Sequence, residues 1–576
     1  MKEKWFVTTK SGDYRELGAR WGVSPMIARI MRNRGIDSDV DAAAFLHSEK
    51  AQLTDGIVMK DCEKLVEILA GKIKSGVKIR VIGDYDIDGV CSTYILMKGI
   101  RMAGGTVDHV IPHRVKDGYG LNDKLIRDAK DAGIDTIITC DNGIAAINEI
   151  ELAVELGMTV LVTDHHQVPF YEENGEKIEK LVRAEAIVDP HRAGDETPYK
   201  EICGAVVAWK VVLDLLDTMG IPVPADNDFY EIAAFATIGD VMPLTGENRT
   251  LVKNGLKRLE NTTNIGMQAL IGINELTENT LSPYHVGFIL GPCLNATGRL
   301  DSAENALQLL LAQDESSAHS YAVMLKEMNE SRKNLTEQGV IAAMDEACSP
   351  ERENDRVLVI LLPDAHESIA GIVAGKVRER TGKPTFILTM GKTSEGETCA
   401  KGSGRSIDEY NMYEEMTKVS DIFIKFGGHA MAAGLSLELD RVDEFRKRLN
   451  ENCTLTEDEL AAKIKIDMVM PLKYATIGFA EELKLLEPCG TSNERALFAE
   501  KNVSITGGRV LGKNRNVYKC TADDGSGVKM DAVYFGDAEG LENYILDHPV
   551  ISITYSPDIN EFRGSRNIQI IIKNYQ

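Results

Sequence analysis

Short apolar runs and amphipathic stretches alternate along residues 76–220 of the chain. Each apolar run has the length of a buried strand, and segments with helical spacing of apolar positions lie between them. Such an alternation is typical of a doubly wound, mostly parallel β-sheet. The sequence therefore predicts an α/β domain whose strands lie at residues 78–82, 107–111, 136–140, 159–163 and 186–188.

The same kind of pattern divides the rest of the chain into further units. A small helical lead-in is expected over residues 1–75, and helices complete a first α/β lobe over residues 76–315. A long amphipathic helix over residues 316–348 is expected to bridge to a second α/β lobe over residues 349–458. Five short strand-like segments in residues 459–576 predict an all-β barrel such as an OB-fold. The expected fold class is therefore α/β, with two α/β lobes joined by a long helix and a C-terminal OB-fold barrel.

Length, charge and cysteine usage narrow the class of protein. The chain has 576 residues, which is too long for one hydrophobic core, and a net charge of −24. That charge argues against a protein that coats nucleic acid, but allows an enzyme with a locally basic channel. The ten cysteines form no CxxC pair, which favours reduced thiols. With no apolar signal core and no membrane-length apolar run, we expect a cytoplasmic protein that does not associate with membranes.

Three aspartates follow the first predicted strand on alternate residues. Asp84, Asp86 and Asp88 precede a turn at Gly89, and a helix is expected from Cys91. In an extended chain alternate side chains share a face, so three carboxylates would converge at the strand's C-terminal end. Because like charges repel, a divalent cation such as Mg²⁺ or Mn²⁺ would relieve the cluster. A solvated acidic turn remains the alternative for this motif by itself.

The other four predicted strands also end in polar side chains. Arg114 comes shortly after the second strand, Asp141 follows the third, and Asp164-His165-His166 follow the fourth; the fifth ends in 189–192, Asp-Pro-His-Arg. Two adjacent histidines point to different sides, so one can join the carboxylates as a ligand while the other faces substrate. Histidine with several carboxylates is a ligand set for Mn²⁺ or Mg²⁺ rather than for a thiolate-rich zinc site.

Further candidates lie beyond residue 220. Asp240 ends an apolar run, and Arg299 is expected in a loop before a helix, although a surface ion pair is an alternative for Arg299 and for Arg332. Glycine-rich backbone beside cationic side chains suits a phosphate or sugar. Such stretches contain Ser403, Arg405, Gly427, Gly428 and His429. In the barrel, single-stranded nucleic acid could be held by basic and aromatic side chains, or the barrel could be purely structural; the candidates are Arg509, Lys513, Arg515, Tyr518, Arg563 and Arg566.

Together these motifs resemble those of the DHH phosphoesterase superfamily. The matching stretches are Asp84-Tyr-Asp-Ile-Asp-Gly89, Asp141-Asn-Gly143, Asp164-His-His166 and residues 239–249. The glycines and histidine of 427–429, with Ala432-Ala-Gly434, resemble the DHH-associated second domain. The order of the parts over nearly the whole chain is similar to that of the bacterial single-strand-specific DNA exonucleases in this superfamily.

This resemblance implies an activity and a role for each residue. It implies two divalent metal ions, Mn²⁺ or Mg²⁺, and 5′→3′ degradation of single-stranded DNA to 5′-mononucleotides, in DNA recombination and repair. The implied metal ligands are Asp84, Asp86, Asp88, Asp141, His165 and Asp240. Asp141 would bridge the ions, Asp164 would support the ligands, and His166 and Arg299 would act on the scissile phosphate. Arg114, Ser403 and Arg405 match a 5′-phosphate site, while Arg299, Gly427, Gly428 and His429 match substrate contacts.

The resemblance also implies partners and leaves alternatives. A RecQ-type helicase and a single-strand-binding protein are the expected partners, and a monomer is the expected state. The loop at residues 487–494 departs from the Gly-Pro-Phe-Gly loop expected before the barrel, which bears on the barrel's grip on DNA. The main alternative is a phosphodiesterase of the same superfamily that acts on short oligonucleotides or cyclic dinucleotides. An inorganic pyrophosphatase is disfavoured because Ile82 stands where a histidine is needed, and the complete ligand set argues against a non-catalytic single-strand-binding factor.

Overall fold

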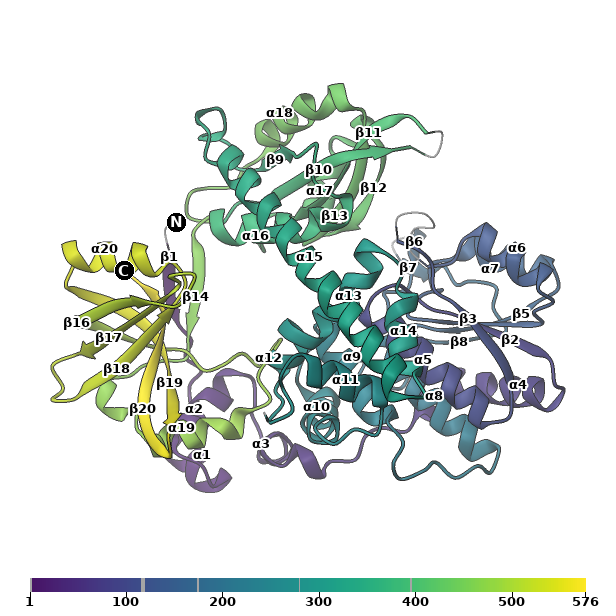
Figure 1. Cartoon of the computed structure of the whole chain (residues 1–576), viewed down its shortest axis with the longest axis horizontal. Coiled ribbons are helices and arrows are strands. Elements are labelled where there is room, and N and C mark those ends of the chain that lie inside the picture. The colour runs from purple at the N-terminus through teal and green to yellow at the C-terminus, as the bar shows by residue number, and fades with distance from the viewer. Residues whose placement is uncertain (1–2, 115–119, 174–175, 279, 394–395) are drawn as a thin grey trace.

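The computed structural model describes residues 3–114, 120–173, 176–278, 280–393 and 396–576. Its three bodies are two α/β lobes and a β-barrel (Figure 1). The long helix α15 (Glu315–Ala347) runs from one α/β lobe to the other, beginning one residue before the predicted start. It begins at Asp314, whose side chain accepts a hydrogen bond from the backbone N–H of Ser317, an N-cap that fixes the start of the helix.

The first lobe is built on a five-stranded, fully parallel sheet in the order β3-β2-β4-β5-β8. Its strands match the five predicted, with the second displaced by one residue: β2 (Lys78–Ile82), β3 (Thr106–Val110), β4 (Thr136–Cys140), β5 (Thr159–Thr163) and β8 (Ala186–Val188). One face is covered by α4 (Cys62–Lys74), α5 (Ile87–Met102) and α8 (Gly204–Thr218), and the other by α6 (Asp123–Asp131) and α7 (Ile147–Glu155). All carboxyl ends of the strands therefore meet at one edge, where the site forms.

Helices complete this lobe, as predicted. They are α9 (Phe229–Gly239), α10 (Gly246–Leu259), α11 (Ile265–Ile273) and α14 (Glu304–Leu311). Between α11 and α14, one helical segment over residues 283–300 joins α12 (Pro283–His285), a π-helical turn (Val286–Leu290) and α13 (Gly291–Leu300). A π-turn inside a helix is rare and often marks a functional position.

The second lobe has a mixed five-stranded sheet in the order β12-β13-β11-β10-β9. Its strands are β9 (Leu358–Leu361), β10 (Thr385–Lys392), β11 (Thr398–Arg405), β12 (Phe423–His429) and β13 (Ala432–Leu437). The helices around it are α16 (Ala370–Thr381), α17 (Met412–Thr417) and α18 (Val442–Asn452). Strands β9 and β10 are parallel and the other pairs are antiparallel. Ser403 and Arg405 are alternate residues at the carboxyl end of β11, so their side chains share one face of the sheet.

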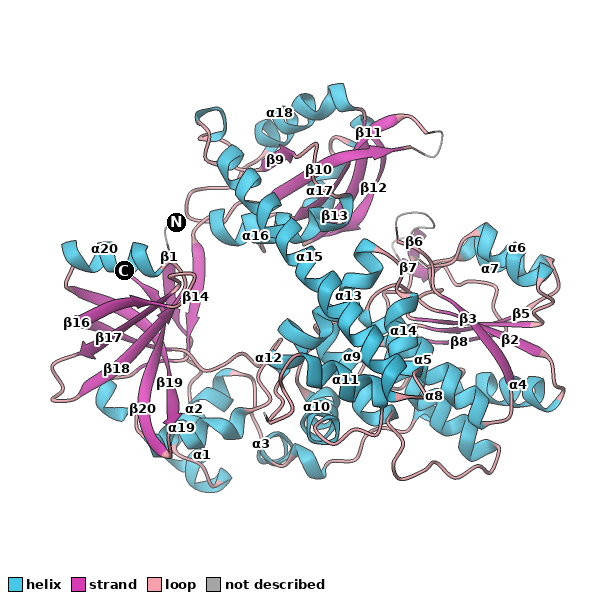
Figure 2. Cartoon of the chain, in the orientation of Figure 1, coloured by secondary structure: helices cyan, strands magenta, loops and turns pink. Residues whose placement is uncertain are grey.

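The C-terminal body is the predicted all-β barrel (Figure 2). Its five long strands are β16 (Phe498–Leu511), β17 (Val517–Asp523), β18 (Lys529–Phe535), β19 (Val550–Phe562) and β20 (Ser565–Tyr575), and the two-residue β15 (Met468–Val469) pairs with β16. Pairing of β16 with β19 closes the sheet, so the barrel leaves no open edge between these two strands. The short α20 (Ala538–Asp547) and α19 (Ile477–Leu483) flank it.

The N-terminal segment shares the barrel's core. Its elements are β1 (Glu3–Val7), α1 (Tyr14–Trp21), α2 (Pro25–Asn33) and α3 (Asp39–Leu46). The fully buried Ile27, Ile30 and Met31 of α2 pack in one cluster with the barrel interior, and β1 pairs in parallel with β14 (Ala462–Ile466). The N-terminal segment and the barrel thus form one body. The sequence predicted only a small helical lead-in and neither the strand β1 nor the packing of α2 against the barrel.

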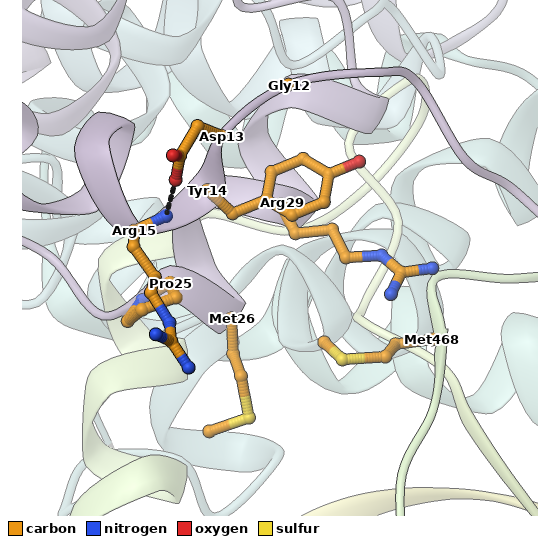
Figure 3. A pocket seen from close by; sticks show the side chains of 8 residues that line it. All are labelled: Gly12, Asp13, Tyr14, Arg15, Pro25, Met26, Arg29 and Met468. Carbon is orange, nitrogen blue, oxygen red and sulfur yellow. Dashed lines mark hydrogen bonds between the residues drawn. The ribbon is translucent and has the colours of Figure 1, made fainter.

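A shallow pocket of about 600 Å³ lies where α1 and α2 approach Met468 (Figure 3). Arg29 lies with its guanidinium carbon 5.8 Å from the centre of the Tyr14 ring. Among the described helices, none is both long and apolar enough to cross a lipid bilayer.

Candidate active site

The three aspartates after β2 are held in different ways. Asp86 caps α5: its carboxylate accepts hydrogen bonds from the backbone N–H groups of Asp88 at 3.0 Å and Gly89 at 3.1 Å. The helix therefore starts at Ile87, and the prediction that Asp88 lies on an extended chain was wrong. A helix N-terminus carries unpaired N–H groups and a partial positive charge, so it can hold acids close together where a strand would separate them.

Each carboxylate points into one buried space at the sheet edge. Asp88 accepts hydrogen bonds from Gly204 and Ala205 at the start of α8, at 2.6 and 2.8 Å. Asp84 accepts one from Gly120 at 3.4 Å, while its second oxygen, Oδ2, is buried and has no hydrogen-bond partner among the described residues. A buried carboxylate oxygen without a donor is costly, so a cation at this position would stabilise the fold.

Strands β4 and β5 and helix α9 bring the remaining candidates to the same place. His165 Nε2 lies 3.1 Å from Asp141 Oδ1, 3.5 Å from Asp88 Oδ2 and 3.8 Å from Asp240 Oδ2. Asp141 is buried and adopts a φ of +58°, a left-handed conformation that Asp tolerates better than most residues. Asp240 follows α9 as its C-terminal cap.

Three groups of side chains have ligand atoms within 4.8 Å of one another. They are Asp84, Asp86 and Asp141; Asp88, His165 and Asp240; and Asp141, His165 and His166. Asp141 and His165 each belong to two groups, so neighbouring cations would share ligands. Carboxylate oxygens with an imidazole suit Mn²⁺ or Mg²⁺, and these residues fit such ions in donor type and in the unpaired oxygen of Asp84.

The electrostatics of the metal-free site favour cation binding. Burial, followed by the charge of Asp86, raises the pKa of Asp84 to about 8. Burial and the charges of Asp88 and Asp86 raise the pKa of Asp240 to about 8, and the pKa of the buried Asp141 is also well above its usual range. Without a cation, Asp84 and Asp240 are therefore mostly protonated at neutral pH, and a divalent ion would replace these protons.

His166 is tuned differently from its neighbour. Its Nδ1 lies 2.7 Å from Asp164 Oδ1, and Asp164 also accepts hydrogen bonds from the backbone N–H groups of Ile144 and His165. Burial alone would lower the pKa of His166, but the hydrogen bond and charge of Asp164 raise it to about 9. At neutral pH His166 is thus a half-exposed cation beside the carboxylates, and Asp164 orients both histidines.

Four guanidinium groups gather next to this centre. Burial, followed by the charges of Arg114, Arg332 and Arg405, lowers the pKa of Arg299 to about 10. Burial and the charge of Arg114 lower that of Arg405 as well. Two of them donate to uncharged backbone carbonyls, Arg299 to that of Ser368 at 2.9 Å and Arg405 to that of Gly404 at 2.7 Å. The guanidinium carbon of Arg114 lies 5.0 Å from the centre of the Tyr85 ring. Clustered cations of this kind are suited to binding phosphate.

Two of these arginines differ from their expected setting. Arg299 lies in the last turn of α13 and not in a loop. Arg332 donates two hydrogen bonds to the Asn329 side chain, at 3.2 and 2.9 Å, and forms no ion pair within the described residues. The helix that begins before the π-turn continues through α13 to Leu300 and so includes Arg299.

The second lobe contributes the remaining predicted residues. Ser403 and Arg405 project from β11, and a side chain at Gly371 of α16 would come within 2.7 Å of Arg405, so this glycine leaves room for the guanidinium. Gly428 has a φ of +147°, and an added Cβ would meet the Ala432 carbonyl at 2.3 Å. Gly428 is therefore required by the β12–β13 hairpin itself, whereas Gly427 faces open space and His429 is exposed.

Sequence reasoning missed two contacts that shape the centre. Asn295 of α13 accepts a hydrogen bond from the Ile87 backbone N–H at 2.8 Å and so holds the start of α5. Gly204 packs so close that an added Cβ would lie 2.9 Å from Asp141 and 3.0 Å from Asp88. Gly204, at the start of an apolar helix, was the one sequence feature that could have indicated close packing there. Nothing in the sequence linked this glycine to residues 84–88.

Family models match three parts of the chain. The model described as the DHH family, N-terminal domain, matches residues 78–237, and the DHHA1 domain model matches residues 354–454. The RecJ OB domain model matches residues 466–574. These ranges fall on the first lobe, the second lobe and the barrel.

Relatives match over nearly the full length. The chain is 33% identical over 580 residues to the single-stranded-DNA-specific exonuclease RecJ of Bacillus subtilis, covering 99% of this chain and 70% of that one. It is 32% identical to RecJ of Escherichia coli, covering 96% and 95%. The structure of Thermus thermophilus RecJ in complex with Mn²⁺ superposes with a TM-score of 0.82 at 26% identity, covering all of this chain and 80% of that one. The Mg²⁺ complex of the same protein gives 0.77 at 25% identity, covering all of this chain and 78% of that one.

Proposed function

The chain belongs to the RecJ family of single-stranded-DNA-specific exonucleases, and on that premise we propose that it degrades single-stranded DNA from the 5′ end to 5′-mononucleotides. The observation that carries this proposal is the meeting of two kinds of group at one sheet edge. The carboxylates and imidazoles around Asp141 form the first kind. The second kind is a cluster of arginines, of which Arg299 donates to an uncharged backbone carbonyl. Such a pairing places cations against both the non-bridging oxygens and the terminal phosphate of a nucleic acid.

Two divalent cations, when bound, would supply charge neutralisation and a nucleophilic water near neutral pH. Asp84, Asp86 and Asp141 would hold one of them, and Asp88, His165 and Asp240 the other, with Asp141 near both. Gly204 and Ala205 keep Asp88 in place through two backbone hydrogen bonds, so this ligand is oriented before substrate arrives.

His166 and Arg299 would act on the phosphate itself. The Asp164 carboxylate keeps His166 protonated, so its ring can donate to a phosphoryl oxygen as negative charge builds there. Arg299 is fixed by the Ser368 carbonyl of the second lobe, which positions its guanidinium between the two lobes. Both groups are charged before the reaction begins, and neither has to reorganise.

The second lobe would decide which end of the strand is read. Ser403 and Arg405 on β11, with Arg114 of the first lobe, would hold a terminal 5′-phosphate, and His429 and Gly427 would contact the adjoining nucleotide. A 5′-phosphate bound there places the first internucleotide bond over Asp141 and its neighbours. A space between the lobes too narrow for a duplex would account for a preference for single strands.

An end-labelling experiment tests this proposal. The protein would be incubated with Mn²⁺ and a long single-stranded DNA labelled at one end or the other, beside the matching duplex and a dinucleotide. Release of mononucleotides from the 5′ end of the single strand, with the duplex spared, is the expected result. Cleavage of the dinucleotide alone would replace the proposal with a short-substrate phosphodiesterase, and release from the 3′ end would remove the assignment of the 5′-phosphate site.

Partners follow from the same requirement for single strands. A helicase of the RecQ type would supply unwound strands, and a single-strand-binding protein would keep them unpaired. We expect either protein to raise the rate on a tailed or partly unwound duplex without changing the rate on a short oligonucleotide. An unchanged rate on both substrates would argue against either protein as a partner.

A further inference from the structure

A groove of about 1390 Å³ begins beside the proposed metal ligands and ends at the barrel. Gly239 and Val241, the two neighbours of Asp240, line its near end, and Pro557 of β19 and Lys573 of β20 line its far end. Arg405 of the arginine cluster belongs to the second lobe, so a strand whose 5′ end is bound there would have this groove as a path towards the barrel.

Two aromatic rings stand exposed in the wall of the groove. Tyr284 and Phe288 are 61% and 68% exposed, and their rings stack at 5.1 Å with an interplanar angle of 27°. Val241 beside them is 67% exposed and has a φ of +59°, which is strained for a β-branched residue. Large apolar side chains are seldom left together in water unless they bind something, and flat rings stack well on nucleobases.

One helical segment connects these rings to the reaction centre. Residues 283–300 present Tyr284 and Phe288 near their start, Asn295 against the start of α5, and Arg299 at their end. Eleven residues separate Phe288 from Arg299, which corresponds to roughly 17 Å along a helix at about 1.5 Å per residue. The rings are thus held at a fixed distance from the group that would contact the scissile phosphate.

Charged side chains of both signs line the groove beside the apolar ones, so it is not a site for a purely apolar occupant. Lys257, Lys484 and Lys573 line it, and none of the three forms an ion pair within the described residues. Five carboxylates also line the groove: Asp558 pairs with Arg495 and Glu561 with Arg566, while Glu260, Glu487 and Glu494 form no ion pair within the described residues. Ammonium groups and stacked rings in one groove suit the phosphates and bases of a single strand.

We propose that Tyr284 and Phe288 form a stacking platform for a base on the 3′ side of the scissile phosphate, several nucleotides from the 5′ end. This inference rests on the proposed exonuclease function and adds to it a second point of attachment. The platform grips the strand while the 5′-terminal nucleotide is removed, so it acts on long substrates and not on those that end before reaching it. It positions the substrate and takes no part in the chemical step.

Kinetics on long and short substrates test the proposal. The double substitution Tyr284→Ala with Phe288→Ala should raise KM for long single-stranded DNA roughly five- to a hundredfold, the range expected for losing one stacked base. Hydrolysis of a 5′-phosphorylated dinucleotide should be unchanged. Phe288→Trp, which keeps a flat ring, should retain activity near that of the unaltered protein. Tyr474→Ala, which removes a ring that is 49% exposed and lies outside the groove, serves as a control.

A scan with the unaltered protein gives a second test that does not depend on any variant folding. Single abasic sites placed at successive positions from the 5′ end should raise KM at one fixed position, and the double variant should lose this sensitivity. Equal tolerance of abasic sites at every position would overturn the platform. If the unaltered protein releases no nucleotides from long single strands at all, the exonuclease assignment fails instead, so the two failures are separable.

Discussion

Arg249 of α10 joins the first lobe to the segment that precedes the barrel. It is 1% exposed and has no carboxylate partner within the described residues. Its guanidinium lies 3.7 Å from the centre of the Phe45 ring and donates to five backbone carbonyls at 2.7–3.5 Å: those of Phe45, Leu485, Leu486, Glu487 and Pro488. One side chain thus binds both the N-terminal segment and the loop that replaces the expected Gly-Pro-Phe-Gly sequence.

The cost of removing this side chain follows from its acceptors. The Asn493 side chain also donates to the carbonyls of Leu486 and Pro488, at 2.8 and 2.7 Å, so those two keep a donor. The other three acceptors, the carbonyls of Phe45, Leu485 and Glu487, are left without this donor. Leu485 and Glu487 are exposed residues, so water can reach their carbonyls. At about 1.5–3 kcal/mol each, reduced by rehydration, the loss is about 3–5 kcal/mol.

We therefore expect Arg249→Met to loosen the barrel and N-terminal body from the first lobe. In chemical denaturation, the variant should lose about 3–5 kcal/mol of unfolding free energy or show a separate early transition. Proteolysis should become faster within residues 484–494. Arg249→Lys should be intermediate, because an ammonium group has fewer donors than the guanidinium fork. Lys257→Met, an exposed change on the same helix, serves as the control.

Identical denaturation curves and cleavage rates for Arg249→Met and the unaltered protein would refute this reasoning. Such a result would mean that the five hydrogen bonds are replaced by water at little cost. Loss of dinucleotide hydrolysis would also count against it, because the proposed metal ligands lie in the first lobe and should survive undocking of the barrel.

Three further predictions concern the site. Asp141→Asn keeps a residue that tolerates a positive φ, and should lower hydrolysis by more than the roughly 10–100-fold typical of losing an outer partner, while fluorescence anisotropy still detects DNA binding. Arg405→Gln should lower the rate ratio of 5′-phosphorylated to 5′-hydroxyl DNA about tenfold, and an unchanged ratio would remove this residue from the 5′-phosphate site. The pKa values of Asp84 and Asp240 are about 8 in the folded protein and about 4 in the unfolded chain, so without metal the folded state binds extra protons between these pH values. In chelator, the stability of the protein should therefore fall as pH rises from 6 to 9, and Mn²⁺ should reverse this trend. A denaturation midpoint that does not change with pH would contradict the assignment.

The parallel sheet and its polar edge were predictable because both depend on local pattern. Five apolar runs of strand length set the sheet, and the residue after each run falls at the same edge whatever the strand order. Asp84, Asp141 and Asp164 could therefore be grouped before any contact was known. The division of ligands into two groups was not predictable in this way, because it depends on where α5 begins and on how α9 brings Asp240 across.

Contacts between distant segments were out of reach for pattern reasoning. The side chains that hold the centre in place, Asn295 and Gly204, lie more than a hundred residues from the loop they support. The shared core of α2 and the barrel joins segments more than four hundred residues apart, and only burial in the folded chain reveals it. Helix and strand periodicity report the face that is buried but not the partner that buries it.

The loop at residues 487–494 gives the departure from the expected sequence a physical meaning. The carbonyls of Glu487 and Pro488 in this loop accept hydrogen bonds from Arg249, and Arg34 of the N-terminal body donates to the Asn493 side chain at 2.5 Å and to the Glu494 carbonyl at 2.6 Å. The same loop lines the groove that contains Tyr284 and Phe288. Two arginines and the Asn493 side chain thus fix this loop without a Gly-Pro-Phe-Gly sequence. The groove wall and the docking of the barrel are one structure, so a change in the loop should alter the handling of long strands before it alters cleavage at Asp141.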